Sequence, residues 1–238
     1  MMRLLRNWLD PTLIVLAALS VAAIFLGHEN AFARVGLCSF VWCPHWSSSH
    51  AWEKIAYDLG AGSLISLLFY VLVVRVPDHQ KRVRFKRSFR KKYQIFKEDC
   101  ISVMLSVADG SFMWGFHSEL TYQSKFREYF NEDVGQGQDR WDRLFNNLDE
   151  YHLKKLVTYM EVFRDETAFI LASVDIPDNE PFEFLQRLTS NIFLLKDSTA
   201  DYDSKKSLLG FMWDVFAGFS VVSGYRDYDM IDRAIDQI

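Results

Sequence analysis

The sequence predicts an all-α protein, made of a two-helix transmembrane hairpin and a cytosolic multi-helix bundle. Three observations support this fold class: two apolar runs near the N-terminus, a basic run directly after the second, and apolar residues at three- and four-residue spacing through most of the remainder. Apolar runs of this kind suit the hydrocarbon core of a bilayer. The later spacing is typical of amphipathic helices, and no strand-like alternation interrupts it.

Charge divides the chain of 238 residues into two parts. Residues 1–92 contain 13 Lys and Arg against 5 Asp and Glu, whereas residues 93–238 contain 14 against 26, a net charge of −12. Binding to nucleic acid depends on clustered Lys and Arg side chains. We therefore expect no nucleic-acid partner for the acidic part.

Residues 1–10 are predicted to be cytosolic, and residues 11–27 to form the first transmembrane helix, because no charged residue interrupts them. The basic start, the apolar run and Ala31-Phe32-Ala33 also fit a secretory signal with a small-residue cleavage site. Cleavage of this segment therefore stays open. In either case residues 28–54 are delivered to the outer side of the membrane, as a periplasmic loop.

The predicted loop contains two cysteines, Cys38 and Cys43, which can form a disulfide on an oxidising side of a membrane. His45 and His50 follow them and complete four potential zinc ligands, but the spacing matches no standard zinc site. We expect a disulfide or free thiols here, and no metal or other cofactor.

The second transmembrane helix is predicted over residues 55–76. Asp58 is an intramembrane polar residue near its outer end, which is a functional hypothesis by default, or a group at headgroup depth within reach of water. Small residues such as Gly60 and Ser63 permit close packing, either against the first span or against a second copy.

Residues 77–92 form a basic juxtamembrane segment that begins at Pro77. The positive-inside rule places this segment, and with it both termini, in the cytoplasm, so the predicted location is a bacterial inner membrane. Membrane lipids are expected partners, because cations beside a span can contact anionic headgroups. The candidate contacts are Lys81, Arg82, Arg84, Lys86, Arg87, Arg90, Lys91 and Lys92.

Residues 66–100, SLLFYVLVVRVPDHQKRVRFKRSFRKKYQIFKEDC, carry a resemblance. This run resembles an arrangement in uncharacterised bacterial two-span inner-membrane proteins with a cytosolic helical domain, in which a span meets a proline, a basic run and a Tyr-x-x-Phe-Lys helix. The resemblance implies a bacterial source and a two-span architecture. It implies no activity.

Residues 93–238 are predicted to form the cytosolic helical domain. The apolar spacing indicates a first helix to about Asp109, then helices at about 118–130, 139–174, 181–196, 204–222 and 228–238. The 204–222 helix is apolar on nearly every side, and we interpret it as the buried central helix. Asp214 within it is therefore expected to be a buried carboxylate that is paired with an Arg.

The sequence contains no catalytic motif, and we assign no catalytic or metal-binding residue. The function predicted is a membrane-anchored helical module for protein interaction or regulation, with a protein partner or with self-association. The alternative is an oligomerising membrane effector or pore former gated by its cytosolic domain. An enzyme that uses its acidic face and a divalent metal is a third interpretation.

Overall fold

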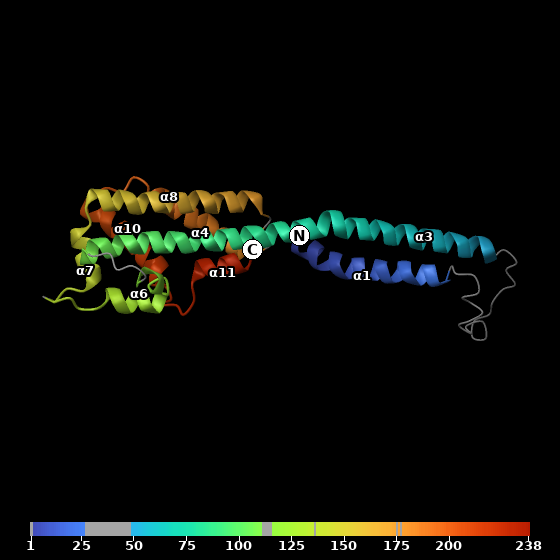
Figure 1. The fold of residues 1–238 in the computed structure, drawn as a ribbon, viewed down its shortest axis with the longest axis horizontal. Helices are drawn as coiled ribbons and strands as arrows, with labels where there is room; N and C mark the ends of the chain where they lie inside the picture. The colour runs from blue at the N-terminus through green and yellow to red at the C-terminus, as the bar shows by residue number, and fades with distance from the viewer. Residues whose placement is uncertain (1, 27–48, 111–115, 136, 175, 177) are drawn as a thin grey trace. The chain divides into compact units, whose positions relative to one another are not determined.

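The structure is a computed structural model that describes residues 2–26, 49–110, 116–135, 137–174, 176 and 178–238. Over these residues the protein is all-α, as predicted (Figure 1). The chain divides into two compact units, Met1–Lys81 and Arg82–Ile238. We describe each unit by itself.

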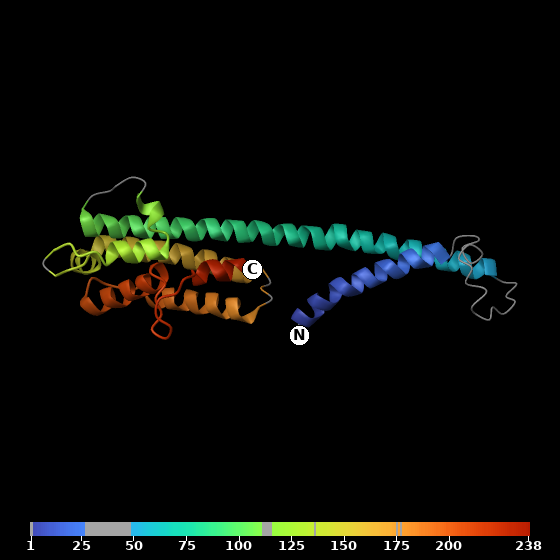
Figure 2. The same ribbon diagram turned by 90° about the horizontal axis from the view of Figure 1, so that it is seen from below.

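Unit 1 is built on two helices, α1 (Met2–Leu26) and α3 (Ser49–Tyr70), and Figures 1 and 2 show α1 running back along α3. Small residues allow their close approach. The buried Ser20 hydroxyl donates to the Leu16 carbonyl at 2.7 Å, and its oxygen lies 2.9 Å from the Ser63 hydroxyl, within hydrogen-bond distance. A Cβ atom on Gly60 would lie 2.8 Å from the Ser20 carbonyl oxygen, so only glycine fits there. The small face of α3 therefore packs against α1 of the same chain.

One helical segment, Lys54–Asp109, is long and apolar enough to cross a membrane by length and composition. The apolar part of α1, Pro11–Phe25, is shorter. At 1.5 Å per residue it extends only about 22 Å, against about 30 Å for a hydrocarbon core. Among the described residues one candidate membrane helix is thus found, whereas the sequence predicts two in the chain, and the two-span hairpin stays a prediction.

The helix changes its hydrogen bonding just before Pro77. Residues Val71–Arg75 form a π-helical turn, η2, in which the Val76 N–H donates to the Val71 carbonyl. Proline has no N–H to donate, and its ring crowds the carbonyl four residues earlier. A local π turn is one way in which a helix accommodates such a position, and α4 (Val76–Asp109) continues beyond it.

Unit 2 packs the remainder of α4 against shorter helices. They are α5 (Phe116–Glu119), α6 (Gln123–Phe130), α7 (Arg140–Asn147), α8 (Glu150–Ser173), α9 (Asn179–Leu194), α10 (Tyr202–Phe216) and α11 (Met230–Asp236). Stacked aromatic rings join α4 to α8 and α10: the Phe96 ring centroid lies 4.6 Å from that of Phe163 and 5.7 Å from that of Phe216. Aromatic burial therefore supplies much of the core around α4.

The helix predicted over 139–174 is two helices. Leu148 has extended backbone angles, and the Asp149 side chain accepts a hydrogen bond from the His152 backbone N–H at 2.8 Å, which begins α8. An aspartate at this position satisfies one of the free N–H groups of the first helical turn. The hydrogen bond to the Asp149 side chain therefore sets the start of α8, although the apolar spacing continues from α7 into α8 without a change.

The helix predicted over 204–222 is also shorter than expected. α10 ends at Phe216, and Gly218 follows with a φ of 67°, in the left-handed region that glycine adopts readily. The expected helix over 118–130 is interrupted too, since Tyr122 is extended and α6 begins at Gln123.

The three cysteines lie in two different parts of the chain. Cys38 and Cys43, with the possible disulfide, lie outside the described residues. Cys100 on α4 is fully buried, and its burial raises the pKa of its thiol well above the ordinary value. A thiol of this kind is a core residue and reacts poorly.

Candidate functional site

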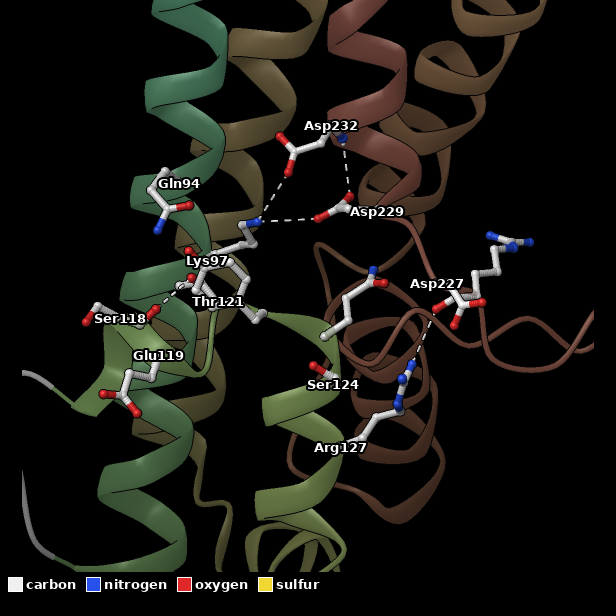
Figure 3. A pocket seen from close by; sticks show the side chains of 13 residues that line it. Gln94, Lys97, Ser118, Glu119, Thr121, Ser124, Arg127, Asp227, Asp229 and Asp232 are labelled. Carbon is white, nitrogen blue, oxygen red and sulfur yellow. Dashed lines mark hydrogen bonds and ion pairs between the residues drawn. The ribbon is translucent and has the colours of Figure 1, made fainter.

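A charged cleft of about 700 Å³ opens in unit 2 between α4, α6, α11 and the segments that join them (Figure 3). The lining side chains are almost all polar or charged. They are Gln94, Lys97, Ser118, Glu119, Thr121, Tyr122, Gln123, Ser124, Arg127, Arg226, Asp227, Asp229 and Asp232.

Lys97 is the most buried charged side chain in the cleft, with only 7% of its side chain exposed. Its ammonium lies 3.3 Å from Asp229 Oδ2 and 3.6 Å from Asp232 Oδ2, as Figure 3 shows. It also lies 4.4 Å from the centre of the Tyr93 ring. A buried ammonium needs such partners, because removing it from water without them is strongly unfavourable.

Asp229 connects α4 to α11 through both of its carboxylate oxygens. Oδ1 accepts from the backbone N–H groups of Ile231 at 2.9 Å and Asp232 at 3.2 Å, and so caps α11. Oδ2 accepts from the Tyr93 hydroxyl at 2.8 Å and from Lys97. The Asp229 carboxylate, which caps α11, thus also binds the Tyr93 hydroxyl and the Lys97 ammonium of α4.

Burial controls the ionisation of two groups here. Burial, and then the charge of Asp229, raises the pKa of Tyr93 well above its ordinary value, so Tyr93 is a permanent hydrogen-bond donor. Burial also raises the pKa of Asp232, the neighbouring charge of Asp229 acts in the same direction, and Lys97 opposes both.

The cleft holds satisfied ion pairs and has no catalytic arrangement. Lys97 is neutralised by two carboxylates, and the Tyr93 hydroxyl donates to one of them. Within the described residues no group of three His, Cys, Asp or Glu side chains could hold a metal ion. The Nδ1 atom of His152, for example, lies 2.7 Å from Oδ1 of Asp149, the residue that caps α8. The geometry supports a structural role for these charges, which join α4 to the start of α11. The loop before α11 contributes Arg226 to the cleft.

That loop, residues 217–226, is fixed at its base by α6. Arg127 donates to the carbonyl oxygens of Ala217 at 2.9 Å and Arg226 at 3.4 Å, and its guanidinium lies 4.9 Å from the Tyr225 ring. Gln123 donates to the Val215 carbonyl at 3.3 Å. Arg127 therefore joins the two ends of the loop, and Gln123 binds the last turn of α10 just before it.

The loop closes on itself in a short hairpin. Backbone bonds join Arg226 to Gly218 at 3.0 Å, and Ser220 to Gly224 in both directions at 3.0 and 2.8 Å. Its tip carries two adjacent apolar side chains, Val221, which is 89% exposed, and Val222, which is 97% exposed. Exposure of two apolar side chains to water on an ordered loop is unfavourable in free energy. Burial of both side chains against a partner would remove this unfavourable term.

A second cavity of about 410 Å³ lies beneath the loop, against α9 and α10. Its wall is largely apolar, with Phe184, Leu188, Phe211 and Val215 among its side chains, and the two tip valines line its edge. The loop therefore contributes to the walls of both cavities, with Arg226 lining the charged cleft and Gly218, Val221 and Val222 lining this apolar cavity.

Asp214 lines the second cavity at an exposed position of α10, so the expected burial of this carboxylate is not observed. The apolar residues of α10 that enter the core, such as Leu208 and Met212, lie on the other face of the helix. Desolvation by its surroundings nevertheless raises the pKa of Asp214, and Arg226 partly opposes this.

The remaining predicted site residues do not line the cleft. Asp58 is exposed on α3 and pairs with no described residue. In the basic segment, Lys86 and Arg90 bind Asp236, and Lys92 binds Glu166. Lys81 and Arg82 also take part in interactions. Arg84, Arg87 and Lys91 are exposed and make no hydrogen bond or ion pair with any residue that the structure describes.

The sequence did not reveal the cleft, because its residues come from segments that are far apart in the chain. One signal was available: Asp229 precedes an amphipathic run, as an N-cap residue does. Comparison with known proteins adds no name to this site, since no family model, curated protein or solved structure matches the chain.

Proposed function

We propose that the chain is a membrane-anchored helical module that binds another protein through loop 217–226. The observation that supports this function is the loop itself, in which two almost fully exposed valines stand on a base whose two ends are joined by Arg127. Apolar anchors that fill a pocket on the partner supply much of the affinity of protein interfaces.

The partner surface follows from charge. Residues 93–238 carry a net charge of −12, and Glu119 and Asp227 stand in the adjoining cleft. The complementary partner offers an apolar pocket for the valines with basic groups around it. Residues 55–76, the apolar part of the helical segment Lys54–Asp109, supply the membrane anchor in this proposal, and the exposed apolar side chains of α3, such as Leu59 and Ile65, contact lipid.

Site-specific photo-crosslinking in native membranes tests the proposal. A photoreactive residue replaces Val222, and the control places it at Lys154, whose side chain is 71% exposed on α8. We expect one adduct of defined mass from position 222 and none of that mass from position 154. Val221→Ser should abolish the adduct, whereas Val221→Ile should retain it. No adduct at position 222, or the same adducts at both positions, would refute the function.

A second candidate function, an oligomerising membrane effector, is favoured by Asp58. Its carboxylate is exposed on α3 and has no partner among the described residues, and an ionised group inside a bilayer needs a partner or water. Another copy of the chain would supply that environment. The test is membrane potential during overexpression: depolarisation that Asp58→Asn abolishes supports the effector, and an unchanged potential excludes it.

A further inference from the structure

The basic segment of α4 divides into two sets of cations. Lys86 donates to the Asp236 carbonyl at 2.6 Å, Arg90 to the Asp236 carboxylate at 2.6 Å, and Lys92 to Glu166 at 2.7 Å. These bonds fasten α4 to α11 and α8. The first set therefore serves the fold of unit 2.

The second set consists of Arg84, Arg87 and Lys91, which we call the basic stripe. Their spacing of three and four residues places them on one face of α4. The core residues Phe89 and Tyr93 lie about half a turn away, on the opposite face. All three stripe side chains are exposed, and none makes a hydrogen bond or ion pair within the described part of the chain.

The lack of described partners for the stripe is informative because residues 93–238 are acidic. Residues 93–238 contain 26 Asp and Glu, and they provide partners for Lys86, Arg90 and Lys92 but none for the stripe. The predicted span, residues 55–76, ends eight residues before Arg84 in the chain. The stripe therefore follows the predicted membrane anchor closely in the sequence.

We propose that the basic stripe binds the anionic phospholipid headgroups of the membrane that holds the chain. Arg guanidinium groups bind phosphate oxygens in a forked geometry, and Lys adds a point charge. Each cation close to an anionic leaflet strengthens the association about five-fold. This inference rests on the membrane anchor of the proposed function, and it is independent of what loop 217–226 binds.

A fluorescent probe beside the stripe tests the inference in the full chain. Ser88 is exposed and adjoins Arg87, so Ser88→Cys is labelled in a chain that also carries Cys38→Ser and Cys43→Ser. Cys100 is buried and stays unlabelled. The chain is placed in lipid nanodiscs of phosphatidylcholine with an increasing fraction of phosphatidylglycerol, and a quencher is attached to a minor headgroup.

Quenching of the probe should increase with the phosphatidylglycerol fraction and should disappear in about 0.5 M salt, where charges are screened beyond a few ångström. The variant Arg84→Gln/Arg87→Gln/Lys91→Gln should lose this response, with an apparent affinity lower by about five-fold for each charge removed. Its unfolding temperature should stay that of the parent chain.

The matched control removes the same charge from the other set, Lys86→Gln/Arg90→Gln/Lys92→Gln. It should lower the unfolding temperature and keep the response to phosphatidylglycerol. Equal quenching in neutral and anionic discs, or equal loss in both triple variants, would overturn the inference and leave the anchor and the loop untouched. A chain that alkaline washing removes from the discs would overturn the anchor and the inference together.

Discussion

Asp229→Ala should lower the free energy of unfolding by about 3–4 kcal/mol, because three interactions end on this one carboxylate. Loss of the α11 cap costs about 1 kcal/mol. The buried Tyr93 hydroxyl loses its acceptor, which costs about 1 kcal/mol. Lys97 keeps only Asp232, at 3.6 Å, as a carboxylate partner. Removal of one member of a buried ion pair costs about 3–5 kcal/mol, and the remaining partner reduces this to about 1–2 kcal/mol.

Asp229→Asn separates the charge from the hydrogen bonds. The amide keeps one acceptor oxygen and nearly the same shape, so one of the two functions, the cap or the Tyr93 bond, is retained. We expect a loss of about 2 kcal/mol for this variant, since only the attraction to Lys97 and one acceptor are removed.

Thermal unfolding of the detergent-solubilised chain, followed by circular dichroism, measures both variants. At about 2–4 °C per kcal/mol for a domain of this size, Asp229→Ala should lower the unfolding temperature by about 10 °C and Asp229→Asn by about 5 °C. A shift below about 2 °C for Asp229→Ala would refute the reasoning. So would equal shifts for the two variants, since the function that the amide retains, the cap or the Tyr93 bond, would then contribute nothing.

Three further predictions concern single contacts. Gly60→Val should separate α1 from α3, because its Cβ would lie 2.8 Å from the Ser20 carbonyl oxygen. In a titration with denaturing detergent, the free energy of helix association should fall by about 1–3 kcal/mol. Gly62→Val should show no such loss, because a Cβ atom at Gly62 has open space around it. Asp236→Asn should lower stability at pH 7 by less than about 1 kcal/mol, because the Arg90 bond holds the pKa of this largely exposed carboxyl below its ordinary value. That stability is present above the unfolded-state pKa of about 3.9 and is lost as pH falls through the lower folded-state pKa, so the two unfolding temperatures should converge in acid. Asp149→Ala should lower the unfolding temperature through loss of the α8 cap, and an unchanged unfolding temperature would show that the His152 N–H is equally well satisfied by water.

The sequence predicted the helical class because apolar spacing is a local property. The face formed by Tyr93, Phe96 and Cys100 is the buried face of α4. Spacing alone did not place the ends of the helices. The 139–174 stripe continues in phase through Asp149, and only the hydrogen bond from this side chain to the backbone shows the break. An aspartate before an amphipathic run is a signal for such a break, and it deserves as much weight as the run itself.

The candidate site depended on packing between distant segments, which one sequence does not encode locally. Asp214 appeared buried because its neighbours in the sequence are apolar, but α10 has an open side, and Asp214 lies on it. The division of the basic segment into two sets was not predicted either. Once Phe89 and Tyr93 define the buried face, helical geometry places Arg84, Arg87 and Lys91 opposite it, although the partners of Lys86 and Arg90 required the fold.

The closed hairpin of loop 217–226 has a consequence for the energetics of binding. A loop that became ordered only on contact with a partner would lose conformational entropy at that moment, which lowers affinity. Here the Ser220 and Gly224 backbone bonds and the Arg127 contacts order the loop during folding. Gly224 has a φ of 70°, so a larger residue there would loosen the hairpin without touching the valines. Affinity for a partner would then fall although every contacting side chain remained in the protein.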